Sequence, residues 1–441
     1  MPRRRAHQPL QVLINNRLCG RLEKQAGGAI SFQYDRDWLD WAPTFPISLS
    51  LPLQTAAWRG APVAAVFDNL LPDNAHVRRQ VAERTGANGA DVFSLLEQIG
   101  RDCVGAMQFL PEGEQADGLP PIQGTPLSDG EIETLLANLP RAPLGIDPDQ
   151  EFRISVAGAQ EKTALLRHNG QWLRPIGTTP TTHILKPQLG EIRTSSGIID
   201  LSDSVENEHY CLTLLEGFGL PVANTEIATF GARKVLVVER FDRRQSGDRL
   251  LRLPQEDFCQ ALSFPSTQKY QKDGGPSAAA LMAKLQESDD PLSDQAKVLK
   301  SQIIFWLIGA TDGHAKNFSL FLGPHGRFAL TPFYDVLSAQ PAFDAKSIPH
   351  KHYTLAMSAG AKPHYKILDV HGRHFVETAK AAGLGPTIIR TAIKEVIEAA
   401  PKAAARAIER MSPGFPEALH ASINGAMAAR LPRLESSWDV L

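Results

Sequence analysis

The sequence predicts an α+β protein with more than one domain, and three observations carry this prediction. The chain has 441 residues, more than the roughly 250–300 at which single hydrophobic cores stop growing. Residues 151–243 are rich in strand patterns, and helical periodicity dominates beyond residue 244. The predicted domains are therefore a small α/β unit (1–112), a linker with a bridging helix (113–150), a small sheet with one helix (151–243) and a mainly helical region (244–441).

Composition and charge argue against several classes of protein. The formal net charge of −2 speaks against nucleic-acid binding over the whole surface, and the tight basic cluster Arg3 to Arg5 is interpreted as a solvated tail. The four cysteines form no C-x-x-C pair, which favours reduced thiols over a zinc or redox site. Without an apolar run of about 18 residues or a signal-peptide pattern, the chain is expected to be cytoplasmic and without a membrane segment.

The first predicted domain opens with strands. Residues 10–14 and 30–34 have strand patterns, and Asn15-Asn16 supplies turn chemistry. Helical spacing follows through Val77 and Val81, and residues 104–110 are predicted to close the unit as a strand.

The next two segments carry clear local signals. Residues 112–126 are rich in Pro, Gly and acids, as in a linker, and Ser128 with Glu131 forms a capping box that predicts a helix start. Asn169-Gly170, flanked by apolar runs, is the strongest hairpin signal in the chain. Residues 183–186 are predicted as a further strand, 205–217 as a helix, and 225–240 as a second hairpin around Gly231.

Helices are predicted for most of the remaining chain. Residues 298–310 are apolar on nearly every side, which predicts a buried central helix. From residue 375 to 431 the Ala-rich sequence is expected to split into three or four short helices at Pro386, Pro401, Pro413 and Pro416.

The loop that follows the buried helix, Thr311 to Phe318, carries the main chemical signal. Asp312 and Asn317 have the D-x-x-x-x-N spacing of a phosphotransfer loop, in which the acid orients the attacking hydroxyl and the amide holds Mg²⁺. A predicted hairpin around residues 323–326 leads to Asp335, a second acid placed to bind metal. The alternative is a helix cap, with Asp312 accepting backbone hydrogen bonds. His314 and Lys316 either position phosphate or structure this loop.

Two upstream segments suit the phosphates of a nucleotide. Residues 154–162, with Ser155 and Gly158, form a small-residue loop whose backbone amides can approach phosphates, although a structural turn fits about as well. Lys186 ends a strand, and Glu206 and Glu208 begin the helix that follows, the order in which a kinase pairs its phosphate-binding lysine with an acid.

A hinge is predicted at residues 237–244, where the sheet gives way to helices. Its backbone can pair with an adenine edge. Arg243 and Arg244 are interpreted as surface charge.

Taken together, these segments resemble the HipA family of toxin kinases, and the resemblance covers nearly the whole chain. The matching blocks, in chain order, are ISVAGAQEKTALL (154–166), THILK (182–186), VERFDRR (238–244), LPQED (253–257), IGATDGHAKNF (308–318) and TPFYD (331–335).

The resemblance implies a two-lobed, protein-kinase-like fold and a serine/threonine protein kinase that uses ATP and Mg²⁺. It implies Asp312 as the catalytic base, Asn317 and Asp335 as Mg²⁺ ligands, and Ser155 as an autophosphorylated serine. The implied nucleotide-binding residues are Ser155, Val156, Ala157, Gly158, Ala159, Lys186, Glu239, Phe241, His314, Asn317 and Asp335.

The resemblance also implies partners. Such a chain acts as the toxin of a type II toxin–antitoxin pair, binds a HipB-like helix-turn-helix antitoxin and, mainly through it, operator DNA. The implied substrate is glutamyl-tRNA synthetase, and the implied outcome is growth arrest and persistence. Two alternatives stay open: a small-molecule or lipid kinase, and a co-repressor scaffold that assembles an antitoxin on DNA.

Overall fold

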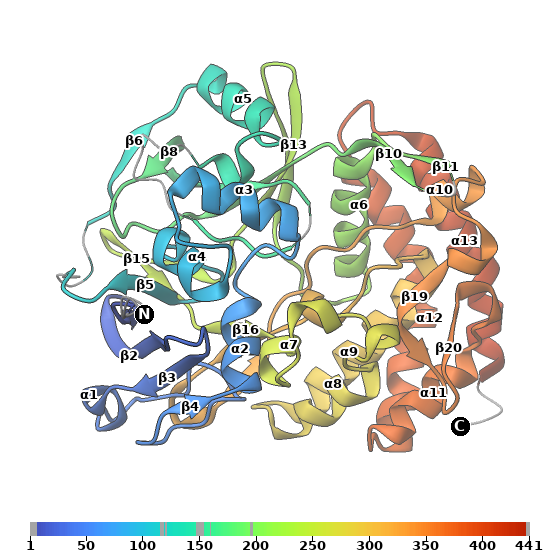
Figure 1. The fold of residues 1–441 in the computed structure, drawn as a ribbon. Coiled ribbons are helices and arrows are strands. Elements are labelled where there is room, and N and C mark those ends of the chain that lie inside the picture. Colours follow the sequence, from blue (N-terminus) through green and yellow to red (C-terminus); the bar gives the residue numbers. More distant parts are fainter. Residues whose placement is uncertain are drawn as a thin grey trace. The chain divides into compact units, whose positions relative to one another are not determined.

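The computed structural model describes residues 7–114, 119, 121–146, 154–158, 160–194 and 197–437 (Figure 1). Arg3 to Arg5 and Ala159 lie outside these residues. The chain divides into two compact units. The first comprises Met1–Pro187, Ala228–Thr267 and Leu320–Phe328, and the second comprises Gln188–Ile227, Gln268–Ser319 and Ala329–Leu441. The four segments predicted above were defined by local pattern, and their boundaries stay predictions.

An antiparallel sheet of five strands begins the first unit, in the order β4-β3-β2-β1-β5. The strands are β1 (Leu10–Ile14), β2 (Arg17–Lys24), β3 (Ile30–Tyr34), β4 (Trp58–Arg59) and β5 (Met107–Pro111). Asn15 and Asn16 turn from β1 into β2 with φ of 50° and 62°, the left-handed conformation that a two-residue hairpin needs. The helices of this region are α1 (Arg36–Leu39), α2 (Ala61–Asp68), α3 (Ala75–Thr85) and α4 (Val92–Ile99).

A second sheet has six strands in the order β12-β13-β9-β7-β8-β6. They are β6 (Gly124–Pro126), β7 (Thr163–His168), β8 (Gln171–Pro175), β9 (His183–Pro187), β12 (Thr225–Phe230) and β13 (Arg233–Glu239). The predicted turn joins β7 to β8, with Asn169 at φ 48°. Before the sheet, α5 (Asp129–Asn138) starts at the capping box predicted from Ser128 and Glu131. The second predicted hairpin is β12–β13 around Gly231.

Short elements follow this sheet along the chain. They are β14 (Arg243–Ser246), β15 (Arg249–Arg252), β16 (Gln255–Asp257) and α7 (Phe258–Ala261). Strands β16, β17 (Ser319–Leu322) and β18 (Phe328–Leu330) form a three-stranded sheet, which includes the hairpin predicted before Asp335.

The second unit is built around α9 (Pro291–Ile308), and the prediction of a buried central helix is confirmed because every side chain from Val298 to Ile308 is buried. Helices that pack against it are α8 (Ala278–Lys284), α11 (Gly372–Ala381), α12 (Pro386–Glu409) and α13 (Glu417–Glu435), the last three orange to red in Figure 1. The unit also contains α6 (Ser204–Gly217), α10 (Gln340–Asp344), and the hairpins β10 (Gly190–Thr194)–β11 (Gly197–Leu201) and β19 (Thr354–Ala359)–β20 (His364–Lys366).

One predicted boundary is wrong. Pro401 lies inside α12 instead of ending a helix there. A proline removes one N–H from the helix ladder, and the apolar face of α12 compensates by packing against α6 and α9.

All four cysteines are buried free thiols, which confirms that prediction. Within the described part of the chain, no helix is long and apolar enough to cross a bilayer.

Candidate active site

The loop with Asp312 begins directly after α9, the central helix of the second unit, and hydrogen bonds hold its first residues in place. Gly309 ends α9 in the left-handed conformation, with φ 72°, and the Ala310 N–H donates to the Phe305 carbonyl at 2.8 Å. Ala310 pairs with Ser338, whose hydroxyl donates to the Ile308 carbonyl at 2.6 Å. The start of the loop is therefore held from both sides of the helix end.

The loop then closes on itself around the backbone of Asp312. The Asn317 Nδ2 and the His314 N–H each donate to the Asp312 carbonyl at 2.8 Å, and the Asn317 N–H donates to the His314 carbonyl at 2.9 Å. Because the Asn317 nitrogen is used inside the loop, its Oδ1 is the atom that suits a cation. The predicted Asp-to-Asn spacing thus joins the two residues in one hydrogen-bonded turn.

The Asp312 carboxylate has a partner that the sequence did not reveal. The Tyr270 hydroxyl donates to Asp312 Oδ1 at 2.5 Å, and the Asp312 side chain is 55% exposed. This geometry speaks against the helix-cap alternative, in which backbone N–H groups would donate to the carboxylate. No motif marks Tyr270, since it lies 42 residues before Asp312 in the chain.

His314 is buried beside the two acids. Its side chain is 4% exposed, its Nε2 lies 4.0 Å from Asp312 Oδ1, and its Nδ1 has no hydrogen-bond partner within the described residues. Burial lowers the pKa of His314, although the charges of Asp312 and Asp335 oppose that shift. The imidazole is therefore neutral near pH 7.

Asp335 has a strained backbone, with φ of 58°. The left-handed conformation is uncommon outside glycine and is enriched at functional sites. The preceding residue fixes the segment, because the Tyr334 hydroxyl donates to the Lys316 carbonyl at 2.8 Å and bonds Ser319 Oγ at 2.6 Å. Asp335 and Asn317 supply the hard oxygen atoms that Mg²⁺ prefers. Across the described residues no group of three His, Cys, Asp or Glu could hold a metal.

The predicted phosphate loop belongs to the first unit and is tightly packed there. Ser155 is fully buried, its N–H donates to the Asp102 carbonyl at 2.9 Å, and its Oγ donates to the Leu70 carbonyl at 2.6 Å. Gly158, with φ of 109°, pairs with Pro72, and a Cβ there would lie 2.5 Å from Lys162 Nζ. The positive φ therefore favours glycine at this position.

Lys186 lies in β9, between β13 and β7, opposite Leu236. Only 6% of the residue is exposed, so it is not the solvated edge lysine that is usual for a strand. Glu206 and Glu208, predicted to follow it on a helix, are buried on α6 of the second unit.

The predicted hinge residues Glu239 and Phe241 flank a buried arginine. Glu239 ends β13 and is exposed, whereas Phe241 contacts the Phe321 ring edge-on at 5.8 Å between centroids. Between them, the Arg240 N–H donates to the Thr182 carbonyl at 2.9 Å, which leaves the Arg240 side chain in the interior.

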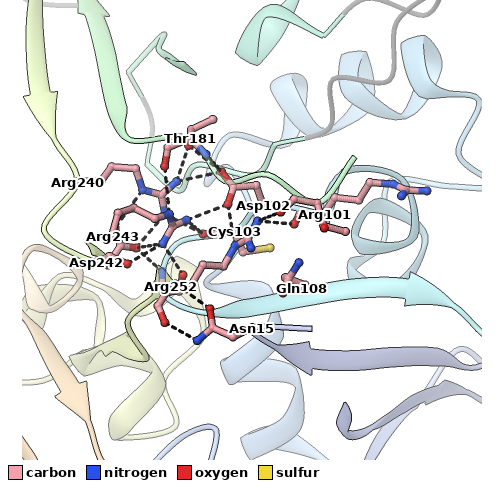
Figure 2. Close-up of polar contacts among 12 residues, drawn as sticks. Asn15, Arg101, Asp102, Cys103, Gln108, Thr181, Arg240, Asp242, Arg243 and Arg252 are labelled. Carbon is pink, nitrogen blue, oxygen red and sulfur yellow. Dashed lines mark hydrogen bonds and ion pairs between the residues drawn. The ribbon is translucent and has the colours of Figure 1, made fainter. Parts of the chain in front are cut away.

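That side chain belongs to a buried ionic cluster, which we define as Asp102, Arg240, Asp242, Arg243 and Arg252 (Figure 2). Arg243 Nη2, Arg252 Nε and Arg240 Nη1 lie 2.9, 3.1 and 3.4 Å from the Asp102 carboxylate. The Asp242 carboxylate lies 2.8 Å from Arg240 Nη2 and 3.0 Å from Arg243 Nη1. Every one of these side chains is at most 4% exposed. The interpretation of Arg243 as surface charge is therefore wrong, although Arg244 is exposed.

The cluster holds both carboxylates ionised. Burial alone would raise the pKa of Asp102, but Arg243, Arg240 and Arg252 outweigh it and hold the pKa well below its usual range. Asp242 likewise has a lowered pKa, because Arg240 and Arg243 outweigh its burial. The hinge backbone is thereby fixed to Asp102, far from it in sequence.

Two family models match the chain. One, described as HipA N-terminal domain, matches residues 10–110, and the other, described as HipA-like C-terminal domain, matches residues 154–404. The second match includes the predicted phosphate loop, the predicted hinge, the Asp312 loop and Asp335.

Individual proteins show the same likeness. The putative kinase Y4mE of Sinorhizobium fredii is 34% identical over 91% of this chain and 92% of its own length. The serine/threonine-protein kinase toxin HipA of Shewanella oneidensis is 30% identical over 75% of each chain. The solved structure of Shewanella oneidensis HipA with HipB and operator DNA covers 98% of this chain and 100% of its own, with a TM-score of 0.79 and 25% identity.

Proposed function

The chain belongs to the HipA family of serine/threonine-protein kinase toxins, and from this membership we propose that it transfers the γ-phosphate of ATP to a protein serine in a Mg²⁺-dependent reaction. The observation that carries the proposal is the closed loop in which Asn317 donates to the Asp312 carbonyl while the Asp312 carboxylate stays half exposed. A half-exposed carboxylate on a fixed loop suits a group that accepts a proton from an attacking hydroxyl.

The remaining predicted site residues would each bind a different part of Mg-ATP. The loop from Ser155 to Gly158 and the Lys186 ammonium would bind phosphate oxygens, and the backbone of Glu239 and Phe241 would bind the adenine edge. Asn317 Oδ1 and the Asp335 carboxylate would hold Mg²⁺, which neutralises charge on the phosphates when bound. Buried His314 would form the floor of the loop beside Asp312 and position the phosphates.

Asp312→Asn tests this proposal, because the amide keeps the shape of the side chain and loses its capacity as a base. We expect phosphate transfer from radiolabelled ATP to cellular protein to fall by about 10²–10⁴-fold, the usual contribution of a general base. Growth arrest on expression should be lost as well. The matched control is Asp248→Asn, an exposed turn residue with a 77% exposed side chain. Transfer by the Asp312 variant at the wild-type rate would overturn the assignment.

Autophosphorylation at Ser155 is part of the proposal. Its hydroxyl is buried against the Leu70 carbonyl, so a phosphate is accommodated only if the loop leaves this position. Modification would then keep the loop displaced and the kinase inactive. Intact-mass spectra after incubation with Mg-ATP should show one added phosphate in the wild type and none in Ser155→Ala, with Ser246→Ala in the exposed β14 strand as the control.

We also propose that the chain pairs with a HipB-like antitoxin and, through it, with operator DNA. The support is the solved complex of the Shewanella oneidensis protein. Glutamyl-tRNA synthetase is the proposed substrate. A comparison of phosphorylated proteins in cells expressing the wild type and the Asp312→Asn variant tests that identity, since a genuine substrate is modified only in the first.

A further inference from the structure

A buried arginine on α13 reaches the end of the central helix of the second unit. Arg430 lies on α13, which packs against α9 and α10, and only 5% of the residue is exposed. Its Nη1 donates to the Leu307 carbonyl at 2.8 Å and to the Trp306 carbonyl at 3.1 Å. Both carbonyls belong to the last turn of α9, where the helical ladder supplies no partner. Arg430 therefore caps α9 from a different helix, and its positive charge lies at the negative end of the helix dipole.

The second terminal nitrogen of Arg430 binds two side chains beside this helix end. Nη2 donates to Gln340 Oε1 at 2.6 Å and to the Tyr353 hydroxyl at 3.2 Å, and that hydroxyl donates to Gln340 Oε1 at 2.5 Å. Gln340 begins α10, Tyr353 directly precedes β19, and both are buried. One guanidinium thus joins α9, α10, α13 and the start of β19.

Gln340 and Tyr353 in turn contact the chain where it leaves α9. The Gln340 N–H donates to Ser338 Oγ at 3.1 Å, and the Ser338 hydroxyl donates to the Ile308 carbonyl at 2.6 Å. A Cβ on Gly309 would lie 2.0 Å from the Tyr353 hydroxyl, so this hydroxyl packs directly on the residue that ends α9. The hydrogen bonds of the guanidinium therefore hold the chain three residues before the proposed base.

The acceptors of Arg430 differ from those of an ordinary buried ion pair. All four of its hydrogen bonds end on carbonyl, amide or hydroxyl oxygens, and within the described residues no carboxylate pairs with it. Burying a charge without an opposite charge is costly, so packing alone would favour an apolar side chain at this position. The guanidinium adds a planar set of donors with fixed directions, which can hold separate elements in one geometry.

We propose that Arg430 is a positioning residue for phosphate transfer, which holds the end of α9 in the conformation that presents the Asp312 carboxylate to the acceptor serine. The inference rests on the proposed kinase function. In that reaction the serine oxygen bonds to the γ-phosphorus, the bond from this phosphorus to the ADP oxygen breaks, and the hydroxyl proton passes to Asp312. Without Arg430 the carbonyls of Trp306 and Leu307 lose a donor, and the loop that begins after Gly309 is no longer held from α13.

The experiment compares Arg430→Met with Ile423→Ala in the full-length chain. Methionine fills the site without donors. Ile423 is a fully buried residue of the same helix, so its truncation leaves a cavity and destabilises the unit without removing these hydrogen bonds. Two quantities are measured at a temperature at which circular dichroism shows each variant to be folded. They are the rate of transfer from radiolabelled ATP to cellular protein at saturating ATP, and deuterium uptake in the peptide 309–318 without ATP.

We expect Arg430→Met to slow transfer by roughly 10–100-fold, because a misplacement of about 1 Å can cost about 10²-fold. Deuterium uptake in the peptide 309–318 should rise, since the loop opens more often when its support is lost. Ile423→Ala should transfer phosphate at the wild-type rate and leave this uptake unchanged. Arg430→Lys keeps a cation for the α9 carbonyls but lacks the fixed fork, so it should fold and slow transfer less than Arg430→Met does.

Transfer at the wild-type rate by folded Arg430→Met would overturn the inference. If that variant does not fold, transfer at the wild-type rate by Arg430→Lys would overturn it. Equal slowing by Ile423→Ala, or unchanged deuterium uptake in the peptide 309–318, would also contradict it, since Arg430 would then only stabilise the unit. A wild type that transfers no phosphate would instead refute the kinase proposal, and the deuterium uptake would still report whether Arg430 holds the loop.

Discussion

Asp102→Asn is the substitution that most directly probes the buried ionic cluster. The amide keeps the size of the side chain and can still accept from the Thr181 N–H and hydroxyl, which donate to Asp102 Oδ2 at 3.0 and 2.7 Å. It removes the charge that three arginines share, and Arg252 then has no carboxylate partner within the cluster. The variant therefore isolates the ionic contribution from the steric one.

The expected loss is large for a single-atom change. Removing one partner of a buried ion pair costs about 3–5 kcal/mol, because the remaining charges stay desolvated without compensation. At roughly 2–4 °C per kcal/mol for a unit of this size, the melting temperature of the first unit should fall by about 6–20 °C. The control is Asp40→Asn, whose partner Arg36 is 92% exposed and whose own side chain is 72% exposed. Its effect should stay within about 0.5 kcal/mol.

Differential scanning calorimetry measures both variants. Adding Arg252→Met to Asp102→Asn should recover part of the loss, because the second change removes the cation left without a partner. A melting temperature for Asp102→Asn within about 2 °C of the wild type would refute the reasoning. The stability of the fold should depend on pH in one direction, because the pKa of Asp102 is lower in the folded than in the unfolded state. The contribution of ionised Asp102 to the free energy of unfolding is present above the unfolded pKa of about 3.9 and is lost as the pH falls below that value.

Two further predictions concern the second unit. Tyr270→Phe should lower kcat by about tenfold or more and leave the KM for ATP unchanged, because it removes a hydrogen bond to the Asp312 carboxylate. A change in the KM alone would contradict the role of Tyr270 in positioning Asp312. Gly309→Ala should impair both stability and transfer, because its Cβ would lie 2.0 Å from the Tyr353 hydroxyl. Gly86 ends α3 at a similar φ but with open space around its Cα, so Gly86→Ala should cost only about 1–2 kcal/mol and leave transfer intact.

Local signals predicted much of the fold. The hairpin at Asn169-Gly170, the capping box at Ser128 and the buried helix α9 each depend on residues close together in sequence, and all three are confirmed. The Asp312 loop was located for the same reason, since its spacing spans only five residues.

Features that depend on distant residues could not be predicted. Arg243 was interpreted as surface charge because no local pattern marks its pairing with Asp102, which lies 141 residues away. The β19–β20 hairpin and Tyr270 carry no pattern of their own. Pro401 was expected to end a helix, but it lies inside α12. The packing of α12 on other helices stabilises it, and the local sequence does not reveal that packing.

The predicted site residues of the two units are held in different ways. Three side chains, Asn317, Tyr334 and Ser338, donate to the carbonyls of Asp312, Lys316 and Ile308, so hydrogen bonds from side chains to backbone order the loop of the second unit. The left-handed Asp335 is the strained point in that arrangement. In the first unit the hinge depends instead on desolvated charges, which lose far more when one partner is removed. Substitutions that disturb the cluster should therefore destabilise the first unit, whereas Asp312→Asn in the loop should reduce phosphate transfer and leave the fold intact.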